Sequence, residues 1–250
     1  MYQNLFLDIK KMKMHVWDDQ KGHLEVPFRK YAYVKDGNGQ HVSLYGDRLK
    51  KVTNYDKDDP TLHESDVPPT TRFLVDNYGD SDEMSVGHRI MFFDIEVEVT
   101  DGFPDVQKAQ NVITSIALYD CITEKYFTYC FDPSKRIESY AKDDEVVEFY
   151  DTEYEMLNKF FQKYLEIRPT IVSGWNSEFF DIPYLYNRAV RVLGPEVANL
   201  LSPISQVLYS EYKKKHTIAG VSSLDYLQLY RQFTFGQKSS YRLDYIGEVE

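Results

Sequence analysis

The sequence has few cysteines and no long apolar run, and these absences exclude several classes of protein. Only two cysteines occur in 250 residues, Cys121 and Cys130, and their spacing fits neither a metal site nor a disulfide framework. No apolar segment approaches the roughly 18–20 residues that a membrane-spanning helix needs, and the first residues lack the apolar core of a signal peptide. We therefore expect free thiols in a reducing compartment, no membrane partner and a cytoplasmic location.

Positive charge is also scarce: the sequence has 29 Lys and Arg residues and 40 Asp and Glu residues, which gives a net charge of −11. This balance argues against a nucleic-acid partner, since phosphate binding favours Lys and Arg. Net charge does not describe local charge, however, and a metal-dependent nuclease carries acidic ligands whose charge is cancelled only when the ions bind. Nucleic-acid binding is weakened by the composition but stays open. The 21 Tyr and 15 Phe residues indicate a globular core.

Residues 91–99 read as a strand in which carboxylates alternate with apolar residues. Side chains two apart on a strand share a face, so Asp94 and Glu96, with Glu98 as a further candidate, form one acidic row, while the apolar residues pack behind it. Like charges at this spacing raise one another's pKa values unless a cation or a proton neutralises them. The segment is therefore either part of a metal site or an edge strand with a solvated acidic face.

A second informative segment covers residues 171–185. Its short β-branched run ends at Gly174, and a polar turn then leads into a helical pattern with Asp181 near its beginning and Pro183 in its first turn.

The two segments together resemble a known family. Phe-Asp-Ile-Glu at residues 93–96, followed by Asn-x-x-x-Phe-Asp at residues 176–181, is similar to the first two motifs of the DEDD-type 3′–5′ exonuclease of family B DNA polymerases. Further matching segments, which resemble the polymerases of T4-like bacteriophages, are Asp-Gly-Phe-Pro at 101–104, Gly-Trp-Asn at 174–176, Tyr-Leu-Tyr-Asn-Arg at 184–188, Ser-Ser-Leu-Asp-Tyr at 222–226 and Ser-Tyr-Arg-Leu-Asp-Tyr-Ile at 240–246. The resemblance covers most of residues 89–250 and, more weakly, residues 1–88.

The fold class that follows is α/β. The resemblance implies a ribonuclease H-like DEDD exonuclease domain with a mixed sheet over residues 89–250, preceded by a small β-rich N-terminal domain over residues 1–88. The residue pattern agrees, because strands in succession are followed by apolar residues at helical spacing over 153–167, which predicts a helix and a β-α-β crossover. In the N-terminal part, the Asp-Gly-Asn-Gly turn at 36–39 predicts a hairpin between 31–34 and 41–45. Residues 50–69 are expected to form a connecting region.

The chemistry follows from the carboxylates. Hard oxygen ligands suit Mg²⁺ or Mn²⁺ better than Zn²⁺, and two such ions can activate a water and stabilise the departing 3′-oxygen. By resemblance, Asp94 bridges the ions, Glu96 holds the ion that activates water, and Asp181 binds or orients the second ion. The implied function is proofreading, the removal of the 3′-terminal nucleotide by a phage-type replicative polymerase.

The resemblance also implies contacts with DNA. Phe103 matches the residue that stacks on the terminal base, although it could instead be a turn residue folded onto the core. Asn176 is expected to be a turn residue that supports the site rather than a ligand. Residues 206–222 resemble the hairpin that helps to part primer from template, with Lys213, Lys214 and Lys215 near its tip, where they contact the backbone or only solubilise a loop.

One expected motif is missing. Tyr140 and Asp144 have the spacing of the third exonuclease motif, Tyr-x-x-x-Asp, but they precede the second motif, so we expect the third motif beyond Glu250. We expect a fragment that alone binds metal weakly and cleaves poorly. Its expected partners are single-stranded or primer-template DNA, the rest of the polymerase in cis or as a separate chain, and replication accessory proteins, in the host bacterial cytoplasm if phage-encoded. The alternative is a non-catalytic DNA-binding or assembly fragment of a split or truncated polymerase.

Overall fold

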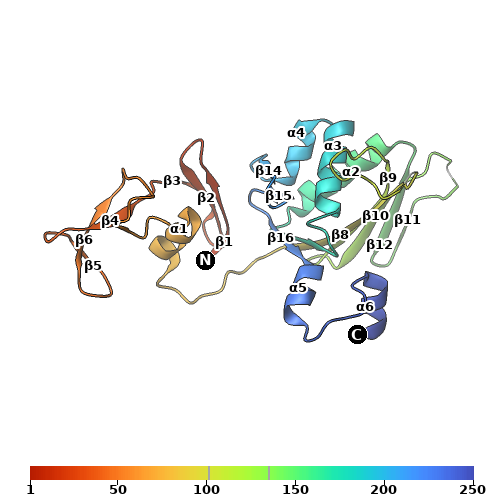
Figure 1. Cartoon of the computed structure of the whole chain (residues 1–250). Helices are drawn as coiled ribbons and strands as arrows, with labels where there is room; N and C mark the ends of the chain where they lie inside the picture. Colours follow the sequence, from red (N-terminus) through yellow and green to blue (C-terminus); the bar gives the residue numbers. More distant parts are fainter. Residues whose placement is uncertain (101, 135) are drawn as a thin grey trace. The chain divides into compact units, whose positions relative to one another are not determined.

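The computed structural model describes residues 1–100, 102–134 and 136–250, which form two compact units, Met1–Val86 and Gly87–Glu250 (Figure 1). Asp101, the first residue of the Asp-Gly-Phe-Pro motif, lies outside the described residues. Within the described ranges, no helix combines the length and the apolar character needed to cross a membrane.

The first unit is β-rich and contains two small sheets and one helix. The antiparallel three-stranded sheet has the order β1-β2-β3, with β1 Tyr2–Asp8, β2 Lys13–Asp18 and β3 Gly22–Pro27. The four-stranded sheet has the order β5-β6-β4-β7, with β4 Ala32–Lys35, β5 His41–Val42, β6 Arg48–Val52 and β7 Leu62–His63. The helix α1, Pro69–Tyr78, contacts β1 and buries Phe73 in a core with Met14, Val16 and Phe28.

Two sequence predictions for this unit are wrong. The turn at 36–39 does not join a hairpin, because β4 pairs with β6, and the short β5 pairs with β6 on its other side. Val42 is 64% exposed and Leu44 is fully exposed, so no apolar face fixes the predicted register. The region 50–69 also ends at a helix that the sequence reading missed, where Pro69 takes the first helical position and needs no amide partner.

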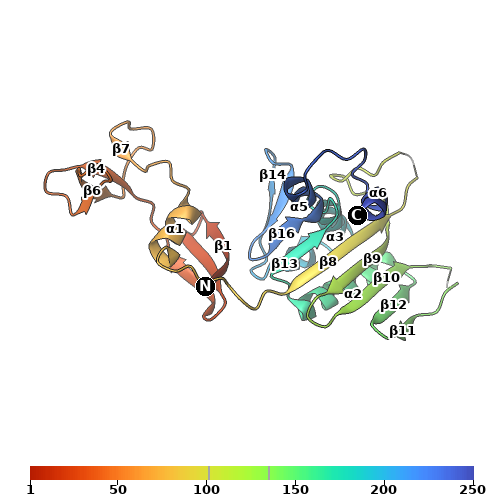
Figure 2. The same ribbon diagram turned by 90° about the horizontal axis from the view of Figure 1, so that it is seen from below.

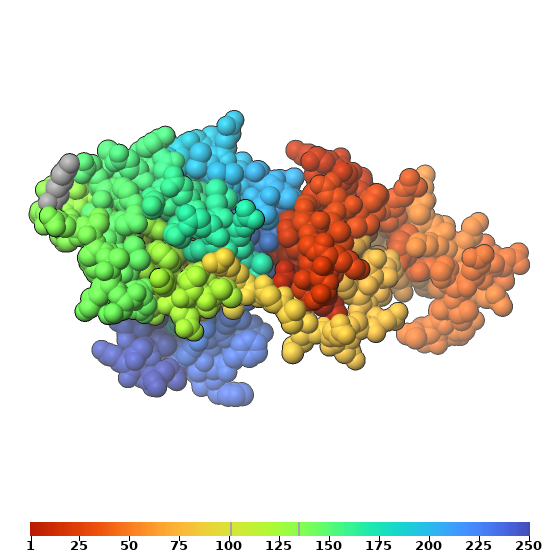
Figure 3. Space-filling view, turned by 180° about the vertical axis from the view of Figure 1, so that it is seen from behind, coloured from red at the N-terminus to blue at the C-terminus, as the bar shows by residue number. Residues whose placement is uncertain are grey.

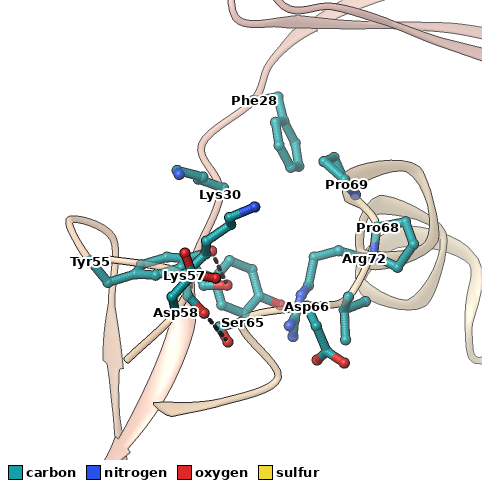
Figure 4. A pocket seen from close by; sticks show the side chains of 12 residues that line it. Phe28, Lys30, Tyr55, Lys57, Asp58, Ser65, Asp66, Pro68, Pro69 and Arg72 are labelled. Atoms are coloured by element: carbon teal, nitrogen blue, oxygen red, sulfur yellow. Dashed lines mark hydrogen bonds between the residues drawn. The ribbon is translucent and has the colours of Figure 1, made fainter. Parts of the chain in front are cut away.

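The first unit also contains a cavity of about 440 Å³ (Figure 4). Phe28, Pro69 and Arg72 lie on one side of it, and Tyr55 lies on the other. Arg72 stacks over the ring of Tyr31 with its guanidinium 4.3 Å from the ring centre. The cavity is therefore built from residues of the first unit alone.

The second unit is organised around a seven-stranded mixed sheet, which confirms the predicted mixed α/β class. The strand order is β11-β12-β10-β9-β8-β13-β16. Its strands are β8 Ile90–Val97, β9 Ile113–Asp120, β10 Lys125–Phe131, β11 Tyr140–Lys142, β12 Glu145–Tyr150, β13 Ile171–Gly174 and β16 Ser222–Asp225. The pairs β8–β9, β9–β10 and β11–β12 are antiparallel, whereas β10–β12, β8–β13 and β13–β16 are parallel.

Helices lie on both sides of this sheet, with α2 and α3 on one side and α5 and α6 on the other (Figure 1). Their bounds are α2 Glu153–Ile167, α3 Asp181–Val192, α4 Pro195–Ala198, α5 Tyr226–Phe233 and α6 Leu243–Val249, with a 3-10 turn at Asn199–Leu201. The predicted helix over 153–167 is confirmed. Thr152 caps it by accepting a hydrogen bond from the Glu155 amide, and α2 then links β12 to β13 as the predicted crossover.

The sheet has one covered face and one open face at β8. Phe93 and Ile95 are buried in the core with Phe160 of α2, while Phe92, Asp94 and Glu96 are exposed. Seen from below, β9 and β10 are not covered by α5 or α6, and α6 lies near one end of β8 (Figure 2). The alternation of apolar and acidic residues in this strand therefore separates a core face from a solvent-facing acidic face.

Candidate active site

Strand β8 presents the first two predicted carboxylates side by side. Asp94 and Glu96 project from its open face, two residues apart, as the alternation predicted. The Asp94 side chain reaches solvent, but the protein around it limits its hydration and the charge of Glu96 repels its own, so the pKa of Asp94 is raised. The open face therefore carries concentrated negative charge.

The edge of β8 next to this acidic row has no strand partner over its second half. Strand β13 pairs with β8 only at Ile90, Met91 and Phe92. It then ends at Gly174, where a Cβ atom would lie 2.6 Å from the carbonyl oxygen of Phe93, so only glycine lets the two backbones approach this closely. Beyond Gly174 the chain turns away from β8 and leads to α3.

Asp181, the first residue of α3, occupies the edge that β13 leaves open. Its Oδ1 atom accepts a hydrogen bond of 3.1 Å from the backbone amide of Ile95, and only 2% of the residue is exposed. Burial and the nearby charge of Asp94 raise the pKa of Asp181 to about 7. The structure therefore brings Asp181 close enough to Asp94 for their charges to interact.

The turn between β13 and α3 is fastened by a residue that the sequence reading did not single out. Asp225, at the end of β16, is 3% exposed and accepts hydrogen bonds of 3.1 Å from the amides of both Asn176 and Glu178. The same carboxylate caps α5 by accepting from the amides of Leu227 and Gln228. Asn176 has a φ of 63°, in the left-handed region where asparagine is better tolerated than most residues, so its backbone conformation suits a turn.

The three predicted metal ligands fit a hard divalent cation in their chemistry, since all are carboxylates and a cation would offset the charge that raises the pKa values of Asp94 and Asp181. Over residues 1–100, 102–134 and 136–250, however, no group of three or more His, Cys, Asp or Glu side chains is arranged to hold a metal ion. The donors present are therefore of the right type but do not form a closed set of ligands in the described part of the chain.

Phe103 lies beside the start of α3. Its side chain is 80% exposed, and its ring centre is 5.3 Å from that of Phe180, the residue immediately before Asp181. An exposed aromatic ring held against a second ring, next to a carboxylate site, presents a surface on which a base can stack. The alternative, in which Phe103 folds onto the core, does not agree with its exposure.

The segment predicted to form a hairpin does so, with β14 Val207–Ser210 antiparallel to β15 Lys215–Ile218. The light-blue atoms of the stretch around residue 200, which leads into this hairpin, lie on the surface of the second unit in Figure 3. Lys213 and Lys214 lie in the turn, where Lys214 forms an ion pair of 3.1 Å with Glu211. Lys215 begins β15 and forms an ion pair of 2.8 Å with Glu178, so its charge is directed at the turn before α3.

The sequence thus singled out Asp94, Glu96 and Asp181 as candidate ligands but did not identify the contacts of Glu178 and Asp225. Both residues lie inside segments that matched the family, yet neither has a local pattern that identifies its partner. The only signal was the position of Asp225 directly before a helical pattern, which is typical of a helix cap.

Comparison with known proteins places this geometry in a family. The sequence model for the exonuclease domain of DNA polymerase family B matches residues 78–246. The DNA-directed DNA polymerase of Escherichia phage RB69 is 34% identical over 191 residues, covering 65% of this chain and 21% of the phage protein. That of Enterobacteria phage T4 is 31% identical over 183 residues, covering 62% of this chain and 20% of the phage protein.

An archaeal relative, DNA polymerase 1 of Saccharolobus solfataricus, is 32% identical over 145 residues, which cover 53% of this chain and 16% of that protein. The matched part of the chain thus spans about a fifth of the length of the phage relatives. Because the family match covers most of the sequence and includes Asp94, Glu96 and Asp181, the chain belongs to the exonuclease-domain family of family B DNA polymerases.

Proposed function

We propose that this chain is the proofreading 3′–5′ exonuclease portion of a phage-type replicative DNA polymerase and that it hydrolyses the 3′-terminal phosphodiester of DNA. The observation that carries the proposal is that the buried Asp181, whose pKa is raised to about 7, lies near Asp94 of β8, which has Glu96 beside it on the same face of the strand. Such a concentration of negative charge opposes folding unless a cation balances it. A purely structural role does not account for this concentration of negative charge, whereas binding of a cation does.

The cofactor that suits these residues is Mg²⁺ or Mn²⁺, held by Asp94, Glu96 and Asp181. When bound, two such ions supply activation of a water and stabilisation of the departing oxygen. The Ile95 amide holds Asp181 in place by a hydrogen bond, and the alternation of β8 places Asp94 and Glu96 on the same face of the strand. The proposed ligand set needs at least one further oxygen donor beyond these three residues.

The DNA contacts that we propose follow from the residues around the carboxylates. Phe103 stacks on the terminal base, Asn176 supports the turn that leads to Asp181, and the lysines of the hairpin, Lys213 to Lys215, contact the phosphate backbone. The substrate is single-stranded or primer-template DNA.

The domain assignment is also part of the proposal. Residues 1–88 form the N-terminal domain and residues 89–250 the exonuclease domain of a longer polymerase assembly, which works in the host bacterial cytoplasm with the rest of the polymerase, in cis or as a separate chain, and with replication accessory proteins. The boundary between the compact units at Val86 and Gly87 supports this division.

The test is release of mononucleotides from single-stranded DNA labelled at its 3′ end, in the presence of Mn²⁺ or Mg²⁺. We expect slow release that requires the metal ion and is lost in Asp94→Ala. A matched control is Glu98→Gln, which removes one charge from the exposed position just beyond β8 and should keep the activity. Equal release from the wild type and Asp94→Ala would contradict the proposal.

A second candidate function is a non-catalytic DNA-binding or assembly module that retains the exonuclease fold. The observation that favours it is that no group of three or more potential ligands in the described ranges is arranged to hold a metal ion. This candidate predicts DNA binding without nucleotide release in either metal ion, and release that appears only when another polypeptide supplies the missing donor.

A further inference from the structure

The loop between β8 and β9, over residues 102–111, is fastened to α3 along its length. Three neighbouring side chains of α3 donate hydrogen bonds to its backbone carbonyl groups. The bonds are Tyr184 Oη to Asn111 O at 2.9 Å, Asn187 Nδ2 to Val106 O at 2.9 Å, and Arg188 Nη1 to Ala109 O at 3.1 Å and to Gln110 O at 2.6 Å. A loop of this length that depended on its own contacts would be mobile, whereas this one is tied to a helix.

Arg188 makes the most contacts of the three. Its Nε and Nη2 atoms donate to the two carboxylate oxygens of Glu153 at 2.8 and 2.6 Å, and both side chains are about nine-tenths buried. Glu153 also accepts a hydrogen bond of 2.8 Å from the amide of Ile113, where β9 begins. The fork of the guanidinium therefore neutralises Glu153 with two of its nitrogen atoms and holds the loop with the third.

An ion pair that served only stability would need no contact with the loop. The two bonds from Nη1 instead hold the carbonyl groups of Ala109 and Gln110. Ala109 is fully buried and has a φ of 41°, a backbone conformation that costs free energy in a residue other than glycine and persists only where its surroundings enforce it.

The other end of the same loop carries Phe103. Its ring centre lies 5.3 Å from that of Phe180, which in turn lies 5.6 Å from that of Tyr184. Phe180 directly precedes Asp181 in the chain. Phe103 and Asp181 are therefore both attached to α3, one through the loop and the aromatic contacts and the other covalently.

We propose that Arg188 is a positioning residue for the 3′-terminal nucleotide, which acts through the loop by holding Phe103 in a fixed place relative to Asp181. The inference rests on the proposed function, because it takes Phe103 to be the surface on which the terminal base stacks. In this proposal Arg188 does not bind the DNA, and its contacts are with Glu153 and the loop rather than with Asp94, Glu96 or Asp181. Without the hydrogen bonds from Arg188 to the loop, Phe103 is free to move, and the terminal base is held less closely.

The test uses the full chain and single-stranded DNA that carries 2-aminopurine at its 3′ terminus, with a terminal phosphorothioate linkage to resist cleavage. The variants are Arg188→Lys, Phe103→Ala and the double variant. Lysine keeps a cation beside Glu153 but has no fork to reach the loop. We expect each single change to weaken terminal-base binding about tenfold and to reduce the stacking-dependent quenching of 2-aminopurine. The double variant should lose no more than Phe103→Ala alone.

Two results would overturn the inference. One is quenching and affinity in Arg188→Lys equal to the wild type, and the other is a loss in the double variant equal to the product of the two single losses. Wild-type protein that fails to bind the DNA or to quench its terminal base contradicts the proposed function, and the inference falls with it. Wild-type protein that binds and quenches, with an unaffected Arg188→Lys, contradicts the inference alone.

Two further readouts separate positioning from general stability. Hydrogen exchange should rise in residues 102–111 of Arg188→Lys but not in β10, which lies away from the loop. If Arg188→Lys fails to fold, Asn187→Ala takes its place, because it removes only the bond to Val106 and leaves the Arg188–Glu153 pair intact. It should reduce quenching at the 3′ terminus, but not at 2-aminopurine placed inside the strand, and equal quenching of wild type and variant would again refute the inference.

Discussion

Asp181→Asn tests the electrostatics of the candidate site in isolation from catalysis. Asp181 is almost fully buried, and the pKa of its carboxyl is raised from 3.8 to about 7 by burial and by the charge of Asp94. Because the folded chain keeps a proton that the unfolded chain releases above pH 4, the free energy of unfolding falls as the pH rises towards 7. Each pKa unit corresponds to about 1.4 kcal/mol, so the ionised carboxylate costs roughly 4 kcal/mol at pH 8.

Asparagine removes this dependence on pH while keeping an oxygen that can accept from the Ile95 amide. Part of this loss of unfolding free energy has already occurred at pH 5, because the carboxyl of the unfolded chain is ionised there while that of the folded chain is still protonated. Between pH 5 and pH 8 the wild type should therefore lose about 2.5 kcal/mol of unfolding free energy relative to Asp181→Asn.

The assay is urea unfolding of the second unit without divalent ions, followed by Trp175 fluorescence in a Trp17→Phe background, since the chain has two tryptophans. Glu98→Gln is the matched control, because it removes one carboxylate from an exposed position and should follow the wild-type profile. Parallel pH profiles for the wild type and Asp181→Asn would refute the reasoning, since they would show that Asp181 does not titrate with a raised pKa.

Three further predictions concern the contacts around the site. Asp225→Ala removes the acceptor of four backbone amides and should lower the free energy of unfolding by about 2 kcal/mol in urea; an unchanged midpoint would show that these bonds do not hold the turn. Lys215→Met breaks the pair with the half-buried Glu178 and should destabilise the β14–β15 hairpin by about 1 kcal/mol, seen as faster hydrogen exchange there; unaltered exchange would contradict this. Asp120→Asn breaks the ion pair with Arg89, and in the wild type this pair lowers the pKa of Asp120 to about 2. The wild type should therefore be more stable than the variant by about 2.5 kcal/mol at pH 7 and should lose this advantage as the pH falls from 4 to 2. A stability difference that does not depend on pH would exclude the ion pair as its source.

The parts of the fold that the sequence predicted are those with a local, periodic pattern. Residues 153–167 place apolar side chains at helical spacing, and α2 has these bounds. Strand β8 alternates apolar and acidic residues, and its buried and exposed faces follow that alternation. In both cases a single periodicity determines the element and the face that is buried.

The parts that could not be predicted depend on contacts between distant residues. Strand β4 pairs with β6 rather than with β5, although a turn motif follows β4 directly. Asp225 lies 49 residues from its partner Asn176, and no spacing within either segment indicates the contact. Such contacts arise from tertiary packing, which no local propensity encodes.

The candidate site shows the same division. The family motifs identified Asp94, Glu96 and Asp181, but the pKa of Asp181 depends on its burial and on its position against Ile95, which only the structure supplies. Likewise, the motif that contains Arg188 contributed to the resemblance, while its bonds to the 102–111 loop became visible only in three dimensions.

The central claim is that Asp94, Glu96 and Asp181 act together as ligands of divalent cations. The most direct measurement is a titration of the full chain with Mn²⁺ at pH 8, in which the free ion is followed by electron paramagnetic resonance, for the wild type, Asp94→Asn and Glu98→Gln. We predict that the wild type and Glu98→Gln bind Mn²⁺ with similar affinity and that Asp94→Asn binds it at least tenfold more weakly, as expected for loss of a charged ligand. Equal binding by all three proteins would contradict the claim.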